Sequence, residues 1–320
     1  MNLSLVIPIY NERENLPILF EAIYKTMNAL DQSWEAVLVD DGSRDGSLPV
    51  LAEYAERDPS HIRVISFRRN FGQTAALAAG IDHAQGDIIV LMDSDMQNDP
   101  ADIPIMLAKL DEGYDLVSGW RRDRKDNAIT RNLPSSIANR LISLVTGVHL
   151  HDYGCTLKAY RRGALEGFRL YGEMHRFIPV FANSVGARIT EIPVRHYPRK
   201  FGKTKYGLER TVKVILDLFT VKFLVSYASK PIYLFGGTGM ALILGSGALM
   251  FYLFIRRVFD AVSVLGSPLF QLAVMFFILG FQSMLMGLIA ELLVRTYHES
   301  QHKRTYIIHK MINLEEHPHN

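Results

Sequence analysis

Two long apolar runs in the C-terminal third constrain the fold of this chain more than any other feature. Residues 232–255 and 268–294 contain almost no charged side chains. Each run reaches the roughly 20 residues that a helix needs to cross a bilayer. A buried hairpin in a soluble core is the alternative, but two such runs in tandem favour membrane spans. The short connection 256–267 then predicts a transmembrane hairpin, with the N-terminal domain and the C-terminal tail on one side.

The charges around the hairpin predict that this side is the cytoplasm. The chain enters its first predicted strand at once, without a signal peptide. Basic residues flank the two spans on the outside of the hairpin, which favours a cytoplasmic location: Arg210, Lys213, Lys222, Lys230, Arg295, Lys303, Arg304 and Lys310. Arg256 and Arg257 in the connection argue weakly the other way. We therefore expect an integral membrane protein with two spans, whose catalytic domain and tail are cytoplasmic.

The N-terminal half alternates apolar strand patterns with helical patterns. Three apolar segments each end in a polar or acidic cluster: 3–8 before Tyr10-Asn11-Glu12, 35–39 before Asp40-Asp41-Gly42-Ser43, and 88–92 before Asp93-Ser94-Asp95-Met96-Gln97. Helical patterns cover 14–30, 48–57 and 74–84. This order is typical of an α/β fold with a Rossmann-like, mostly parallel sheet. Because such sheets bind ligands beyond the carboxyl ends of their strands, we expect the three clusters to converge.

The cluster after the third strand has the composition of a metal site. Asp93, Asp95 and Gln97 offer oxygen ligands for a hard divalent cation, and such a cation holds a diphosphate. The alternative is that the two aspartates only terminate a strand. No glycine-rich dinucleotide motif or Walker motif is present, so a nucleotide-diphosphate substrate is favoured over a dinucleotide or a P-loop ligand. The net charge of +2 gives no indication of nucleic-acid binding.

The segment before the first span combines an amphipathic pattern with a basic loop. Residues 207–230 predict a helix lying in the lipid headgroup region, with an ordinary surface helix as the alternative. Upstream, Arg199, Lys203 and Lys205 could bind anionic lipids in general or one specific lipid phosphate. A metal-held nucleotide diphosphate, a membrane and a basic loop together indicate glycosyl transfer to a lipid phosphate.

Five motifs, in order along the whole chain, carry a family resemblance. They are Val6–Glu12, Val39–Ser43, Asp93–Gln97 with Pro100, Ser118–Arg121 and Arg199–Tyr206. The chain resembles the family 2 glycosyltransferases that act on polyprenyl phosphates. It is similar to dolichol-phosphate mannose synthases and, most of all, to bacterial bactoprenol (undecaprenyl-phosphate) glucosyltransferases with two transmembrane helices.

The resemblance implies a GT-A fold, a bound Mg²⁺ or Mn²⁺, a nucleotide-sugar donor and inversion at the anomeric carbon. It implies four groups of site residues: Pro8, Tyr10, Glu12 and Asp41 around the base and ribose; Asp93, Asp95 and Gln97 at the metal, with Asp95 as the direct ligand; Arg121 and Arg131 at donor or acceptor phosphates; and Arg199, Lys203 and Lys205 at the lipid phosphate. It also implies a symmetric homo-oligomer, with a tetramer as the hypothesis.

Asp152 has two interpretations. It could lie near the anomeric carbon, as a base or as a group that orients the acceptor, or it could be a turn aspartate before Gly154. A phosphate monoester is already largely dianionic at neutral pH, so a strong catalytic base is unnecessary.

The sequence does not name the sugar. The resemblance favours UDP-glucose, while GDP-mannose and modified pentoses are the donors of relatives with nearly the same motifs. A processive polysaccharide synthase is disfavoured because two spans are too few for a polymer channel. A catalytically silent nucleotide-sugar-binding membrane protein is the alternative from another class.

The sequence predicts four parts: a GT-A domain at 1–206, an interfacial helix at 207–230, two transmembrane helices within 231–295, and a cytoplasmic tail at 296–320. For the end of the chain, a short strand over 305–309 that pairs with a neighbouring subunit and a solvated tail are the two expectations.

Overall fold

The computed structural model describes residues 2–122, 133–165, 170, 174–198, 231–260, 263–300 and 306–314. The chain forms two compact units. The larger unit comprises Met1–Val221 together with Arg304–Asn320, and the smaller one comprises Lys222–Lys303. The larger unit therefore contains segments from both sides of the apolar runs.

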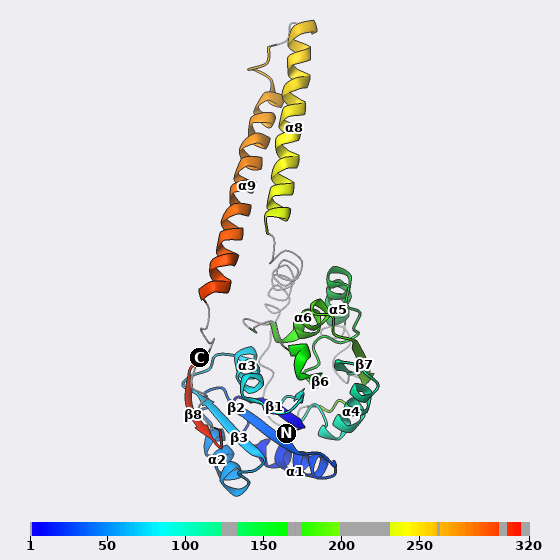
Figure 1. Ribbon diagram of the computed structural model, residues 1–320, viewed down its shortest axis with the longest axis vertical. Coiled ribbons are helices and arrows are strands. Elements are labelled where there is room, and N and C mark those ends of the chain that lie inside the picture. Colours follow the sequence, from blue (N-terminus) through cyan, green and yellow to red (C-terminus); the bar gives the residue numbers. More distant parts are fainter. Residues whose placement is uncertain are drawn as a thin grey trace. The chain divides into compact units, whose positions relative to one another are not determined.

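The larger unit is built on one eight-stranded mixed sheet with the order β7-β5-β6-β4-β1-β2-β3-β8 (Figure 1). The strands are β1 (Leu3–Ile9), β2 (Trp34–Asp40), β3 (Ile62–Phe67), β4 (Ile88–Leu91), β5 (Leu116–Trp120), β6 (Lys158–Arg161), β7 (Ile189–Pro193) and β8 (Ile308–Ile312). Four of the seven neighbouring pairs are parallel, including β4-β1-β2-β3. The predicted α/β class is confirmed. The sequence predicted β1, β2 and β4 of the parallel run, but not β3.

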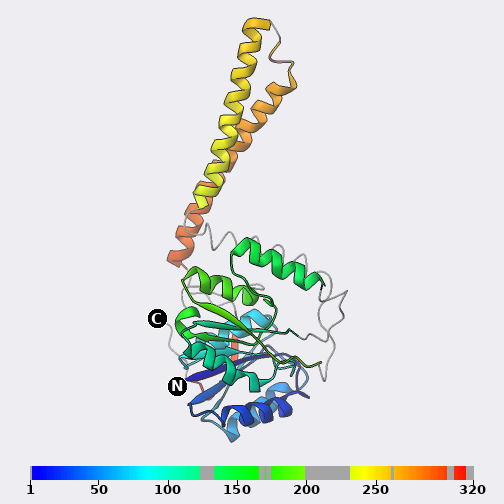
Figure 2. The ribbon, with the colours of Figure 1, turned by 90° about the vertical axis from the view of Figure 1, so that its right-hand side faces the viewer.

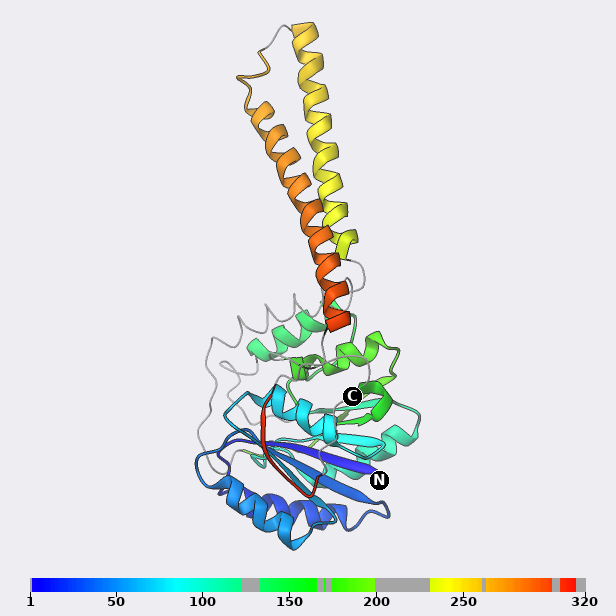
Figure 3. The same ribbon diagram turned by 60° about the vertical axis from the view of Figure 1, so that its left-hand side comes forward.

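Helices cover both faces of this sheet (Figure 3). They are α1 (Leu16–Met27), α2 (Ser47–Arg57), α3 (Gln73–His83), α4 (Ile103–Asp111), α5 (Leu133–Thr146) and α6 (Ile178–Ser184). The first three agree with the predicted helices to within a few residues. Side chains of α1, α2 and α4 share one apolar core with residues of β1, β2 and β4, because burial of an apolar helix face against a sheet is the main stabilising term in such layers.

Helix α3 packs on the opposite face of the sheet at unusually short range. Its buried side is made of small residues, and a Cβ added at Gly80 would lie 2.2 Å from Cγ1 of Val6. Only glycine permits this approach. The close packing brings the N-terminal residues of α3, Gln73 and Thr74, to the carboxyl ends of the parallel strands, where they take part in the site described below.

The end of the chain completes the sheet. Strand β8 pairs antiparallel with β3 of the same chain, at the edge of the sheet. The Tyr306 ring stacks on Phe67 with centroids 5.1 Å apart, and its hydroxyl donates to Asp82 over 2.8 Å. Asn313 donates from Nδ2 to the carbonyl oxygens of Ala55 and Ile62. The solvated-tail expectation is therefore wrong for residues 306–314, because the open edge of β3 offers unpaired backbone groups to cover.

The smaller unit is a pair of long antiparallel helices, α8 (Pro231–Asp260) and α9 (Pro268–Ser300), which lie side by side (Figure 2). The segments Leu234–Phe259 and Pro268–Ala290 are long and apolar enough to cross a membrane. Only 17% of the most apolar window of each is buried in the structure, whereas the core helix of a soluble protein is mostly buried. These bounds agree closely with the predicted spans.

Glycines at the crossing point let α8 and α9 touch through their backbones. A Cβ added at Gly239 would lie 2.6 Å from the carbonyl oxygen of Gly280, and one added at Gly280 would lie 2.7 Å from that of Gly239. Ser246 Oγ donates to the carbonyl oxygen of Ala273 over 2.7 Å. Small residues and serine hydroxyls are the usual means by which helices associate in lipid, where the hydrophobic effect between them is absent.

We expect Gly280→Val to lower the Tm of the detergent-solubilised protein, because the added side chain forces the helices apart at a cost of about 1–3 kcal/mol. The matched control is Gly247→Val on α8, since nothing lies within 4 Å of a Cβ at Gly247. Equal Tm values for the two variants would contradict the glycine contact.

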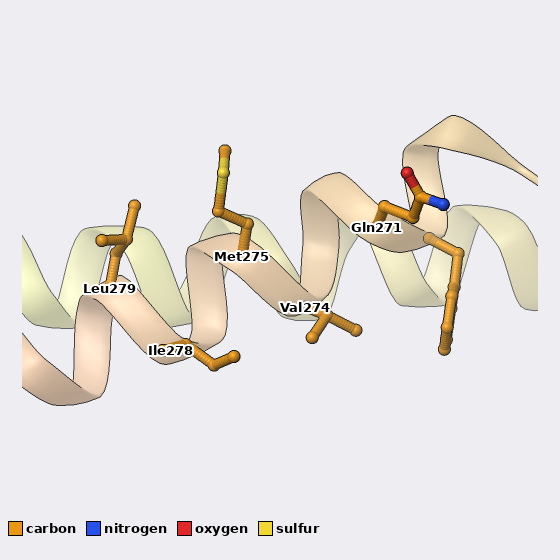
Figure 4. Close-up of a pocket in the computed structure, with 6 residues that line it drawn as sticks. Gln271, Val274, Met275, Ile278 and Leu279 are labelled. Atoms are coloured by element: carbon orange, nitrogen blue, oxygen red, sulfur yellow. The ribbon is translucent and has the colours of Figure 1, made fainter.

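A surface hollow of about 370 Å³ lies on α9, and Figure 4 draws the residues that line it. It is lined by Phe270, Gln271, Val274, Met275, Ile278 and Leu279. These residues belong to one face of a single apolar helix, so the hollow contains none of the predicted site residues.

Candidate active site

The carboxyl ends of β4, β1 and β2 meet at one edge of the sheet. Ser94 Oγ, after β4, donates to the carbonyl oxygen of Pro8 in β1 over 3.0 Å. The backbone N–H of Asn11 donates to Ser43 Oγ over 2.9 Å, and Asn11 Oδ1 accepts from the backbone N–H of Arg44 over 2.8 Å. The predicted convergence of the three clusters is confirmed.

Asp93 lies at the floor of this edge, and both of its carboxylate oxygens have a neutral donor. Gln73 Nε2 donates to Oδ1 over 2.7 Å, and Thr156 Oγ1 donates to Oδ2 over 2.8 Å. Burial raises the pKa of Asp93, and the nearby charge of Asp95 raises it further. The two carboxylates thus lie close enough for the charge of Asp95 to disfavour ionisation of Asp93.

Asp95 follows two residues after Asp93 and is buried, with 6% of its surface exposed. Its Oδ1 accepts the backbone N–H of Gln97 over 3.1 Å, and Met96 between them adopts a left-handed conformation with φ 59°. This tight turn presents Asp95 and Gln97 after the strand has ended. This conformation strains the backbone of Met96, and such strain is typical of functional sites.

This donor set fits a divalent cation that also binds a diphosphate. Mg²⁺ is usually held by one or two carboxylates with substrate phosphates and water completing the shell. Among the described residues, no group of three or more His, Cys, Asp or Glu side chains could hold a metal alone. A divalent cation at this edge would neutralise the negative charge that Asp93 and Asp95 bring close together.

Arg121 and Asp152 form a buried, bidentate ion pair beside the two aspartates. Arg121 Nε and Nη2 donate to the two oxygens of Asp152 over 2.7 and 3.0 Å, and only 14% and 4% of the two side chains are exposed. The backbone N–H of Gly154 donates to Asp152 over 3.0 Å. Burial alone would lower the pKa of Arg121, but the Asp152 carboxylate outweighs it and raises that pKa. This geometry suits an orienting group better than a proton acceptor.

The predicted nucleotide pocket lies at the ends of β1 and β2. Glu12 accepts from Nδ2 of Asn15 over 2.5 Å, and Tyr10 is half-buried just before the left-handed Asn11. The two oxygens of Asp41 accept the backbone N–H groups of Phe71 and Gly72 over 2.6 and 2.9 Å. Asp41 therefore fixes the loop before α3.

Three site neighbours were not predicted to act here: Gln73, Thr156 and Lys158. Lys158 is buried in β6, and its Nζ donates to the carbonyl oxygens of Tyr153 and Cys155. A lysine within an otherwise apolar segment is the one sequence signal that could have marked it.

His175 is also buried here, and its Nδ1 lies 2.7 Å from Thr74 Oγ1. Burial lowers its pKa to about 3, with the charges of Arg176 and Lys158 adding to the effect. His175 is therefore neutral at physiological pH.

Four predicted site residues lie outside the described residues. They are Arg131, Arg199, Lys203 and Lys205, and the same holds for the predicted interfacial helix at 207–230.

The chain is similar to known enzymes over nearly its whole length. It is 41% identical over 321 residues to the dodecaprenyl-phosphate galacturonate synthase of Rhizobium johnstonii, covering 98% of this chain and 94% of that protein. It is 37% identical over 316 residues to the undecaprenyl-phosphate 4-deoxy-4-formamido-L-arabinose transferase of Salmonella choleraesuis, covering 98% and 95%.

The larger unit also resembles a solved structure. Glucosyl-3-phosphoglycerate synthase from Mycobacterium tuberculosis, in complex with Mn²⁺ and UDP-glucose, superposes with a TM-score of 0.52 at 18% identity, covering 70% of this chain and 78% of that chain. At this identity the likeness concerns the fold alone, and it confirms the expected GT-A fold. The family described as Glycosyl transferase family 2 matches residues 4–168. Because this family matches residues 4–168 and both relatives are similar over nearly the whole chain, the chain belongs to the family 2 glycosyltransferases.

Proposed function

We propose that this enzyme transfers a hexose from a nucleotide-diphosphate sugar to a polyprenyl phosphate at a membrane, with Mg²⁺ or Mn²⁺ and with inversion at the anomeric carbon. The observation that carries the proposal is the placement of Asp93 and Asp95 beside the buried Arg121–Asp152 pair at the carboxyl ends of the strands. The two apolar helices and the polyprenyl-phosphate names of the relatives support a lipid acceptor.

Different side chains among those described would act on the leaving group and on the acceptor. A divalent cation held by Asp95, with Asp93 and Gln97 beside it, would act as a Lewis acid for the charge on the departing diphosphate. Arg121, fixed by Asp152, presents a cation to a donor or acceptor phosphate. The acceptor is a phosphate that is already ionised, so the chain needs to orient it but not to deprotonate it. We assign the orienting role to Asp152, acting through Arg121.

UDP-glucose is the donor that we propose first. The motifs quoted above resemble those of the glucosyl enzymes. UDP-galacturonate is the second candidate, because a relative with 41% identity is named a galacturonate synthase. GDP-mannose and a modified arabinose donor remain further choices, and discrimination among them rests on a few positioned hydrogen bonds.

The test is transfer of label into lipid. Purified enzyme is incubated with undecaprenyl phosphate, Mn²⁺ or Mg²⁺ and each radiolabelled donor in turn, and label is extracted into organic solvent. We expect metal-dependent labelling from one donor, abolished by EDTA. No labelling from any donor, with the nucleotide still bound, would instead support the catalytically silent binding protein.

The pH dependence of donor binding should report Asp41. Burial raises its pKa to about 6, against the opposing effect of its two backbone hydrogen bonds. Below that pH the carboxyl group is protonated and accepts those bonds less well, so we expect affinity for the nucleotide sugar to fall as pH falls through about 6. Binding is measured by calorimetry with saturating Mn²⁺ and without lipid, because a phosphate monoester also titrates near pH 6. Asp41→Asn should bind more weakly and without this step; an unchanged step would refute the assignment.

The remaining proposals concern placement and assembly. Of the predicted parts, we propose the interfacial helix at 207–230 and two transmembrane helices within 231–295, with Arg199, Lys203 and Lys205 at the lipid phosphate and Arg131 at a donor or acceptor phosphate. The cytoplasmic location of the larger unit is supported by the basic residues that flank the hairpin. A homo-oligomer, with a tetramer as the hypothesis, would be refuted by crosslinking in membranes that gave monomer alone.

A further inference from the structure

Lys158 occupies a costly position in the sheet. It begins β6, an interior strand, where it lies opposite Leu91 of β4 and Ser118 of β5. Only 2% of its surface is exposed. Burial lowers the pKa of its ammonium group, because a charge in an apolar interior is poorly solvated. An apolar residue would suit this strand better, so the stability of the sheet does not account for a lysine.

The contacts of Lys158 connect it to both halves of the site. Its Nζ donates to the carbonyl oxygen of Tyr153 over 3.3 Å and to that of Cys155. The segment held in this way carries Asp152 at one end and Thr156 at the other. Asp152 orients Arg121, and Thr156 donates to Oδ2 of Asp93 over 2.8 Å. The buried ammonium group of Lys158 thus fixes the loop that supports both the Arg121–Asp152 pair and the Asp93 carboxylate.

We propose that Lys158 is a positioning residue. By holding the 152–156 segment, it fixes the Asp93 carboxylate and the Arg121–Asp152 pair relative to each other. The inference rests on the proposed metal-dependent transfer, but it concerns the chain's own residues. Outer-shell partners of metal ligands typically change metal affinity or activity by about 10–100-fold when they are removed.

The first test compares Lys158→Met with Lys158→Arg. Methionine keeps the length of the side chain and removes its donors, so we expect transfer to fall by about 10–100-fold and Mn²⁺ binding, measured by electron paramagnetic resonance with UDP present, to weaken by about tenfold. We expect Lys158→Arg to recover both, since arginine can donate to the same carbonyl oxygens. Lys109→Met, on the exposed face of α4, is the control that should change neither. Unchanged Mn²⁺ binding and rate in Lys158→Met would overturn the proposal.

The second test separates positioning from a general loss of structure. Thr156→Val removes the contact to Asp93, so its effect on Mn²⁺ affinity should not add to that of Lys158→Met in the double variant. Additive effects on Mn²⁺ affinity would overturn the proposal. It would also be overturned if Lys158→Met and Lys158→Arg lost the same Mn²⁺ affinity and rate together with the same fall in Tm. Mn²⁺ and UDP binding need neither the lipid nor the correct sugar. This readout therefore tests the role of Lys158 even if no donor gives a lipid-linked sugar.

Discussion

Asp95→Asn should lower the rate of sugar transfer by roughly 1,000-fold, which corresponds to the several kcal/mol of charge stabilisation that a metal provides. Asparagine removes the negative charge that Asp95 brings to the proposed metal site, and Asp93 alone leaves that site with one carboxylate. The fold should survive, since asparagine nearly matches aspartate in size and Asp95 is not part of the apolar core. The measurements are the transfer rate, Mn²⁺ binding and the Tm.

Asp87→Asn is the matched control for this prediction. Asp87 lies immediately before β4, at the opposite end from Asp95, and is exposed. It should keep the normal rate, Mn²⁺ affinity and Tm. If Asp95→Asn retained a metal-dependent rate close to that of the Asp87 control, the metal site would have to lie elsewhere.

Asp152→Ala has the second largest expected effect, on both stability and activity. It leaves the Arg121 guanidinium buried without its carboxylate, and breaking a buried pair in this way costs about 3–5 kcal/mol. Arg121 would then lose its fixed orientation, and the loss of one positioned donor lowers rates by about 100–1,000-fold. Thermal unfolding in detergent and the transfer rate measure the two effects separately.

Asp152→Asn distinguishes an orienting group from a base. An amide oxygen can still accept one hydrogen bond from Arg121, so an orienting role predicts a rate between those of the wild type and Asp152→Ala. If Asp152 were a proton acceptor, both variants would lower the transfer rate equally. Glu191→Ala serves as the control for stability, because the neighbouring His151–Glu191 pair has a largely exposed histidine and such pairs contribute about 0–1 kcal/mol. A Tm for Asp152→Ala as high as that of Glu191→Ala would contradict the role of the buried pair.

The part of the fold that sequence could predict is the part encoded locally. Strands β1, β2 and β4 are apolar runs that end in polar clusters. The two apolar helices are long enough to cross a membrane. Strands β5, β6 and β7 are only four or five residues long, and β6 contains Lys158 and Arg161, so their patterns did not stand out. Their pairing is decided by contacts between distant segments.

The same limit applies to the site. Asp93 and Asp95 are two residues apart in the sequence and were predicted from their position after a strand. Gln73 and Thr156 reach Asp93 from 20 and 63 residues away, and no spacing along the chain encodes such a meeting. The sequence therefore singled out Asp93 and Asp95, whereas the groups that hold Asp93 in place became visible only in the folded chain.

Strand β8 gives the enzyme an order of assembly. Its partner β3 is synthesised early, but β8 follows α8 and α9, and the contact between Tyr306 and Asp82 joins residues 224 positions apart. During translation the edge of β3 therefore stays unpaired until both apolar helices have left the ribosome. An unpaired edge is a site for aggregation. The sheet is therefore completed only after the whole apolar hairpin has been synthesised.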